Sequence, residues 1–169
     1  MWRDAGTRGM PTRSTSVAVI ITAATCCIAY AQTPSTHACA LLPASEVKKL
    51  VGLPDPLNLY EKMSPEEEPI GKGSSCSYPS VHVQIDPFEW TTIDSLRTKN
   101  TAQFEAVPGV GEAAFLRVNK MRSVEFAELY ARVGTHVLTI QLDVPDGSST
   151  AAVKPAVVAL AKAYAAKLR

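Results

Sequence analysis

The stretch of sequence that decides the fold is His136-Val137-Leu138-Thr139-Ile140-Gln141-Leu142-Asp143-Val144. From Leu138 to Val144, apolar residues alternate with polar ones. Because successive side chains of a strand point to opposite faces, this alternation predicts a strand with one face in the core. The chain therefore contains a half-buried β-sheet.

Similar patterns precede this strand along the chain. We expect strands over roughly 113–118 and 123–133, with tight turns near Asn119-Lys120 and Gly134-Thr135. Further back, Val81, Val83 and Ile85 alternate with His82, Gln84 and Asp86, and a short strand before Pro79 holds Cys76 and Tyr78. Short hairpin connections imply antiparallel pairing, so we predict an antiparallel sheet of about five strands.

Three helices should flank this sheet. The first has Pro43 at its first position and ends at Gly52. The second begins at a capping-box-like Thr91 to Asp94 spacing and has a polar, exposed body. The third presents an apolar stripe, and Pro155 requires it to start near Ala152 or later, or to be kinked. The stripe consists of Val153, Val157, Leu160, Tyr164 and Leu168. The predicted fold is a single α+β domain with N-terminal, middle and C-terminal helices.

The segment 55–75 contains Pro56, Pro65, Pro69, Gly71, Gly73 and the run Glu66-Glu67-Glu68. This composition predicts an exposed loop within the domain, which we place over 39–169. The polar residues 32–38 before the domain predict a flexible leader.

The N-terminus has the organisation of a secretory signal peptide. Arg3, Arg8 and Arg13 precede an apolar run, 17–30, of about 14 residues, shorter than the roughly 20 that span a bilayer. Ala29-Tyr30-Ala31 matches a signal peptidase site, so we expect 1–31 to be removed between Ala31 and Gln32. A buried helix or an uncleaved anchor is the alternative. Translation starts at Met1 or at Met10, since either leaves a workable signal.

Cleavage changes the charge only slightly. The chain carries 17 Lys and Arg against 16 Asp and Glu, a net charge of +1. The removed segment contains three Arg and one Asp, so the mature chain has a net charge of −1. A nearly neutral domain lacks the electrostatic basis for binding nucleic acid or an anionic membrane surface. No stable membrane span remains after cleavage.

Two of the four cysteines, Cys26 and Cys27, leave with the signal peptide. Cys39 and Cys76 remain, and an even pair in an oxidising compartment predicts one disulfide. Two unpaired buried thiols are the alternative.

The segment from Gly109 to Ala114 fits the letters of the dinucleotide fingerprint G-x-G-x-x-A. The chemistry of that motif requires a helix directly after it, whose N-terminus holds the pyrophosphate. Here a strand-like segment follows, so we interpret the glycines as a tight turn.

The histidines do not predict a metal site. His82 shares a polar strand face with Gln84 and Asp86, while His136 falls on the opposite, core-facing parity and His37 lies in the leader. Metal sites usually need three or four ligands from well-placed elements. We therefore predict neither metal nor cofactor.

The sequence offers no catalytic constellation. No serine lies in a G-x-S-x-G motif. Asp86 and Glu89 flank Phe88 and Trp90, residues that could line a sugar site or simply form a rim of the core. We assign no catalytic residue.

Three ordered motifs resemble a group of small exported bacterial domains of unknown function. They are Cys39-Ala40-Leu41-Leu42-Pro43-Ala44-Ser45-Glu46-Val47, Cys76-Ser77-Tyr78 and Val107-Pro108-Gly109-Val110-Gly111-Glu112-Ala113-Ala114-Phe115. They resemble that group's C-x-L-L-[TP]-x-x-E-V helix, C-x-[YW] strand and V-x-G-[LV]-G-[DE]-x-A-[FY] turn. At fold level the chain is similar to the PsbP-like α/β/α sandwich. The resemblance implies a binding or assembly module and no catalytic residues. Members are often lipoproteins, whereas this chain lacks a lipobox.

We therefore expect a non-enzymatic module of the periplasm or the secreted fraction, whose partner is an envelope protein or a small ligand. The alternative is an enzyme or metal-dependent protein whose site converges only in three dimensions. A pocket with convergent polar groups would favour a small ligand or an enzyme, and a flat exposed apolar patch would favour a protein partner.

Overall fold

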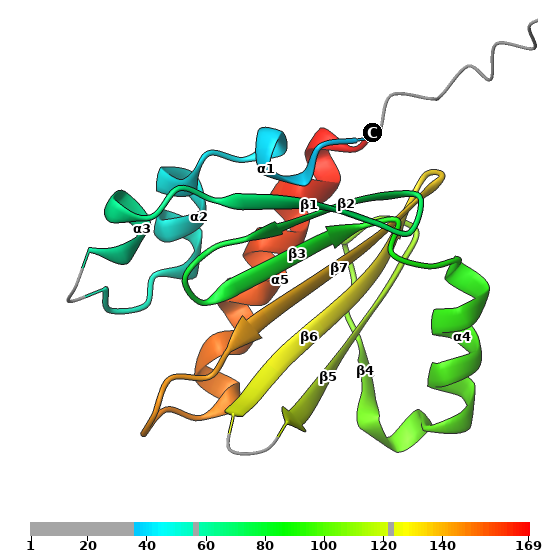
Figure 1. Cartoon of the computed structure of the whole chain (residues 1–169). Helices are drawn as coiled ribbons and strands as arrows, with labels where there is room; N and C mark the ends of the chain where they lie inside the picture. Colours follow the sequence, from blue (N-terminus) through cyan, green and yellow to red (C-terminus); the bar gives the residue numbers. More distant parts are fainter. Residues whose placement is uncertain (1–35, 56–57, 122–123) are drawn as a thin grey trace, which may run out of the picture. The chain divides into compact units, whose positions relative to one another are not determined.

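The computed structural model describes residues 36–55, 58–121 and 124–169 (Figure 1). Its helices are α1 (Ala38–Leu41), α2 (Ala44–Val51), α3 (Leu59–Lys62), α4 (Trp90–Lys99), the 3-10 turn η1 (Thr101–Gln103) and α5 (Thr150–Lys167). Its strands are β1 (Glu66–Ile70), β2 (Gly73–Ser77), β3 (Val81–Ile85), β4 (Phe104–Ala106), β5 (Ala113–Met121), β6 (Val124–Val133) and β7 (His136–Asp143). The signal peptide predicted over 1–31 lies outside the described residues. No helix in the described part of the chain is both long and apolar enough to span a bilayer.

The strands form one antiparallel sheet in the order β1-β2-β3-β7-β6-β5-β4. The α+β class and the antiparallel sheet are confirmed, but about five strands was too few. β1 and β4 were missed because β1 reads Glu-Glu-Glu-Pro-Ile, without alternation, and β4 has only three residues.

The long strands β5, β6 and β7 hold the centre of the core. Their core-facing side chains are buried, and Leu129, Leu138 and Ile140 are fully so. Helix α5 covers this face, with Val157, Leu160 and other residues of its predicted stripe inserted against the sheet (Figure 1). Helix α5 thus covers the apolar face of the sheet, as the helical spacing of its apolar residues predicted.

Helix α5 begins at Thr150, before the expected Ala152, and Pro155 lies inside it. Proline removes one helical hydrogen bond, to the carbonyl four residues earlier, which belongs to Ala151. Ala151 is exposed, so water can solvate that carbonyl. Helix α5 therefore tolerates Pro155 near its N-terminal end.

Helix α2 confirms the first predicted helix. Pro43 is its N-cap rather than its first helical residue, and Gly52 ends it with φ 63°, donating its N–H to the Lys48 carbonyl at 3.1 Å. A left-handed residue at this place favours glycine, which has no Cβ to clash.

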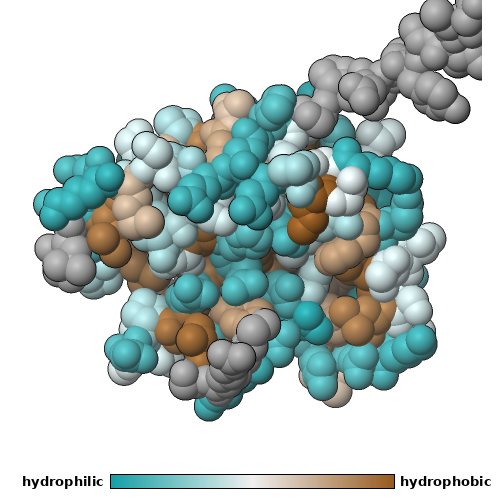
Figure 2. Space-filling model, in the orientation of Figure 1, coloured by the Kyte–Doolittle hydropathy of each residue, from teal (hydrophilic) through white to brown (hydrophobic). Residues whose placement is uncertain are grey.

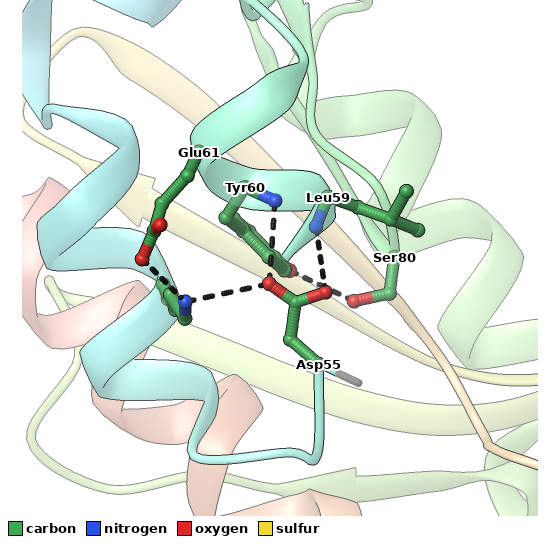
Figure 3. Close-up of polar contacts among 6 residues, drawn as sticks. Asp55, Leu59, Tyr60, Glu61 and Ser80 are labelled. Carbon is green, nitrogen blue, oxygen red and sulfur yellow. Dashed lines mark hydrogen bonds and ion pairs between the residues drawn. The ribbon is translucent and has the colours of Figure 1, made fainter. Parts of the chain in front are cut away.

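The segment 55–75 was predicted to be an exposed loop; its glutamate run 66–68 is indeed exposed, but the segment is not a loop. This segment contains α3, β1 and the start of β2. The Asp55 carboxylate accepts the backbone N–H groups of Leu59 at 2.7 Å and Tyr60 at 3.4 Å (Figure 3). The Tyr60 hydroxyl contacts Ser80 Oγ at 2.8 Å. Specific polar contacts, which no periodicity reveals, thus organise the segment.

Lys48 of α2 completes this cluster, with Nζ 3.4 Å from Asp55 and 3.0 Å from Glu61. Burial alone would raise the pKa of Asp55, but the two backbone N–H groups and Lys48 outweigh it and hold that pKa below its ordinary value. The cluster fastens α3 to the end of α2.

The predicted leader is also corrected at its end. Ala38 is fully buried and begins α1, and its N–H donates to Ser74 Oγ at 2.7 Å. The Ser74 hydroxyl donates in turn to the Thr36 carbonyl at 2.8 Å. The predicted disulfide between Cys39 and Cys76 is present and joins α1 to β2. We call residues 36–41 the N-terminal strap.

Helix α4 lies on the opposite face of the sheet from α5, and the sheet has helices on both sides (Figure 1). Its Ile93 packs with Tyr130 and Val137, which point away from the main core. The capping box predicted at Thr91 and Asp94 was wrong, because α4 begins at Trp90 without a side-chain cap. Asp94 instead pairs with Arg97.

The part of this face formed by β2, β3 and β7 carries polar side chains, including Ser77, His82, Gln84 and Gln141. We call it the open face. In the space-filling view, hydrophilic residues occupy the middle of this side of the domain (Figure 2).

Candidate ligand pocket at the end of the sheet

Three connections meet at one end of the sheet and line a half-open pocket of about 450 Å³. They are the β1–β2 turn at Gly71 and Lys72, the segment Asp86–Glu89 after β3, and the β6–β7 turn with Thr135 and the first residues of β7. Thr36 of the N-terminal strap adds a fourth wall. We call this the end-of-sheet pocket.

Gly71 lets two of these connections approach closely. It has φ 55°, and a Cβ there would lie 2.6 Å from the Pro87 carbonyl oxygen and 2.7 Å from that of Asp86. The next residue, Lys72, donates its N–H to the Asp86 carbonyl at 3.2 Å. Only glycine fits this contact without displacing the backbone.

Asp86 is the organising residue of the pocket. It has φ 53°, a left-handed conformation that aspartate tolerates better than most residues. Its carboxylate accepts the Val137 N–H at 2.7 Å and contacts His136 Nδ1 at 2.7 Å. Its own N–H donates to the Val137 carbonyl at 2.7 Å. Asp86 therefore continues the β3–β7 pairing past the end of β3.

The Asp86 carboxylate orients the His136 ring. A carboxylate only accepts hydrogen bonds, so Nδ1 carries a proton and donates it to Asp86, while Nε2 is left for another partner. The His136 side chain is 28% exposed and lines the pocket. The ring is thus fixed in orientation and open to a ligand.

The outer part of the pocket combines charge with an aromatic ring. Lys72 and Glu89 form an exposed ion pair. Glu89 raises the pKa of Lys72 through its hydrogen bond and its charge, burial acts in the opposite direction, and the charge of Asp86 adds to the rise. Phe88 stands beside this pair with 44% of its surface exposed.

The sequence named several of these residues but misplaced two. It put Asp86 beside His82 on one strand face, which was wrong because the left-handed backbone at Asp86 breaks the alternation and directs the carboxylate to His136. Trp90 is absent from the pocket lining, and its ring stacks on Phe115 at 6.0 Å. Asp86, Phe88 and Glu89 do converge.

His136 was missed as a site residue. The alternation in β7 places His136 on the same face as Leu138 and Ile140, so the sequence predicted a core-facing side chain. His136 is the first residue of β7, however, and lies beyond the edge of the core. No signal in the sequence pairs it with Asp86, which lies 50 residues earlier.

His82 lies on the open face in a separate cluster. Its Nδ1 is 2.9 Å from Ser77 Oγ and its Nε2 is 3.1 Å from Gln84 Nε2. Burial lowers the pKa of His82, although nearby Glu68 and Asp143 act in the opposite direction. Ser77 and His82 are cross-strand partners within the paired ladder, where backbone N–H groups are engaged and offer no oxyanion hole.

The remaining histidine, His37, is mostly exposed and lies 3.4 Å from Glu67. Within the described ranges, no group of three or more His, Cys, Asp or Glu side chains is arranged to hold a metal ion.

The glycine motif at Gly109 and Gly111 forms the tight turn that we interpreted from the sequence. Both residues have positive φ, 78° and 58°, and a Cβ on Gly111 would collide with the Arg132 carbonyl. Strand β5 follows, whereas dinucleotide binding requires a helix there.

No protein-family model, curated protein or solved structure matches this chain.

Proposed function

We propose that the mature chain is an exported, non-enzymatic module that binds a small ligand in the end-of-sheet pocket. The observation that carries this proposal is the convergence of Asp86, His136, Lys72 and Glu89 around one concavity. A volume of about 450 Å³ suits a small molecule, and a few oriented polar groups beside an apolar wall are typical of ligand sites.

Export is supported by the signal-like N-terminus and by the Cys39–Cys76 disulfide, since such bonds persist in oxidising compartments. N-terminal sequencing of the protein from the periplasmic or secreted fraction should give a chain that starts at Gln32. A membrane-bound chain that retains residues 17–30 would contradict the proposal.

Binding rather than catalysis is supported by the state of Asp86. Both of its carboxylate oxygens already accept hydrogen bonds from the protein, from His136 and from the Val137 N–H, which gives Asp86 a positioning role rather than a role as a free reactive group. It instead holds His136 as a fixed hydrogen-bonding group.

One observation favours a second candidate, a hydrolase. A histidine with Nδ1 on a carboxylate and Nε2 open has the arrangement of a general base. Among the described residues, however, no serine, threonine or cysteine is hydrogen-bonded to His136. Turnover of an ester or amide library by the mature chain, lost in His136→Ala, would establish the hydrolase instead.

A thermal-shift screen of the processed chain against small acids, amines, nucleosides and saccharides tests the pocket. At least one compound should raise the melting temperature of the wild type and of the control His82→Ala, but not of His136→Ala. His82→Ala is the matched control because it removes the same side chain from the open face. Equal shifts in all three proteins, or no shift with any compound, would overturn the proposal.

A further inference from the structure

We infer that the ligand of the end-of-sheet pocket is a saccharide. This inference rests on the proposed function and names the chemical class that the site recognises. Three features of the pocket support it: an exposed aromatic ring, polar groups that are already hydrogen-bonded in pairs, and a carboxylate that is engaged by the protein itself.

The aromatic ring belongs to Phe88. Phe104 and Phe115 contact other rings or Arg side chains, and Phe126 is 3% exposed. Phe88 alone of the four phenylalanines is exposed, at 44%, and it lines the pocket. The negative face of an aromatic ring attracts the slightly positive C–H groups on one side of a pyranose. An exposed ring beside polar groups therefore suits a sugar.

The polar groups come as two hydrogen-bonded pairs, Asp86 with His136 and Lys72 with Glu89. A carboxylate or an amine ligand would have to compete with one member of a pair for its partner. A hydroxyl group both donates and accepts, so it can accept from Lys72, donate to Glu89 and pair with His136 Nε2 in either role without separating either pair. Neighbouring hydroxyls on one ring match this mixture of donors and acceptors.

The same geometry argues against hydrolysis of the sugar. A glycosidase needs one carboxylic acid to protonate the leaving oxygen and a second carboxylate across the scissile bond. Asp86 is held by the Val137 N–H and by His136, so Glu89 is the one carboxylate of the pocket lining that is left to a ligand. The pocket therefore binds a mono- or disaccharide unit and leaves it intact.

Saturation-transfer NMR on the processed chain tests this inference with glucose, N-acetylglucosamine, maltose and chitobiose as probes. A second arm measures retention on insoluble cellulose, chitin and peptidoglycan, which distinguishes a free sugar from a polymer. Phe88→Ala should weaken binding at least tenfold in whichever arm is positive. Met63→Ala is the matched control, because Met63 is 51% exposed and is not part of the pocket, and its binding should be unchanged.

Saccharide binding in either arm with this Phe88 dependence supports the inference. No binding in both arms, or equal binding by Phe88→Ala, overturns it. If an acid, amine or nucleoside from the thermal-shift screen binds through His136 while no saccharide does, the saccharide class fails and the pocket proposal stands. If no compound of any class binds, both fail.

Discussion

The two ends of the chain form one sheet but are held together in different ways. The C-terminal region, made of β5, β6, β7 and α5, has strands of eight to ten residues and an 18-residue helix. The N-terminal region, made of α1 to α3 and β1 to β3, has five-residue strands, and two of its helices have only four residues. Long amphipathic elements bury enough apolar surface to fix one another, whereas short ones need a cross-link and specific polar bonds.

The end-of-sheet pocket lies where these regions meet. The N-terminal region supplies Thr36, Gly71 and Lys72, and the C-terminal region supplies Thr135 and His136. Asp86, directly after β3, bonds across to His136 and joins the two sides. The proposed ligand site thus lies at the junction between the region held by packing and the region held by the disulfide and polar bonds.

Truncation of the C-terminal core should have the largest effect. Leu129 is fully buried between the sheet and α5, so Leu129→Ala should lower the free energy of unfolding by about 2–5 kcal/mol. Urea denaturation measures this loss. Val124→Ala in the same strand is the control, because Val124 is 47% exposed and should change stability by less than about 1 kcal/mol. Equal losses in the two variants would contradict the packing described.

Loss of the disulfide should come next. The bond closes a separation of 37 residues, which corresponds to at most about 4 kcal/mol in the chain-entropy model. The variant Cys39→Ser/Cys76→Ser should therefore melt at a lower temperature and expose the N-terminal strap to protease before β5–β7. Alkylation of the denatured, unreduced mature chain provides the check, and two labelled cysteines per chain would refute the bond.

Acid should weaken the N-terminal region through Asp55. Because its pKa is lower in the folded chain than its ordinary value of 3.8, Asp55 stabilises the fold above that value. The stabilisation is lost as the pH falls through the depressed pKa. Between pH 5 and pH 3, melting temperatures should fall more for the wild type than for Asp55→Asn. Parallel pH profiles would show that the Asp55 cluster in Figure 3 does not contribute.

The smallest effect concerns His82 on the open face. Burial lowers its pKa, so its neutral form is preferred in the fold, and stability declines as the pH falls from the ordinary value of 6.5 through the depressed pKa. His82→Gln should flatten this decline and cost about 1 kcal/mol or less at pH 7, because the site is half exposed. Chemical denaturation from pH 7 to pH 5 measures it. A steeper decline of stability with falling pH in His82→Gln than in the wild type would contradict the lowered pKa of His82.

The same division explains which features could be predicted from the sequence. Strand alternation and the α5 stripe defined the C-terminal region, since apolar burial decides those elements. β1 was missed because its residues do not alternate between apolar and polar. It forms a strand because the turn at Gly71 and Lys72 places it beside β2. The Asp86–His136 contact was missed because Asp86 has a left-handed backbone conformation, which points its side chain away from the sheet face that strand alternation predicted.

Amide chemical shifts of the ¹⁵N-labelled mature chain test most directly whether the end-of-sheet pocket is the binding site. The chain is titrated with the compound that gives the largest thermal shift. The amides of Lys72, Asp86, Phe88 and Val137 should shift first and saturate with one common Kd. Shifts centred on Ser77, His82 and Gln84 of the open face, or no saturable shift in the pocket, would contradict the assignment.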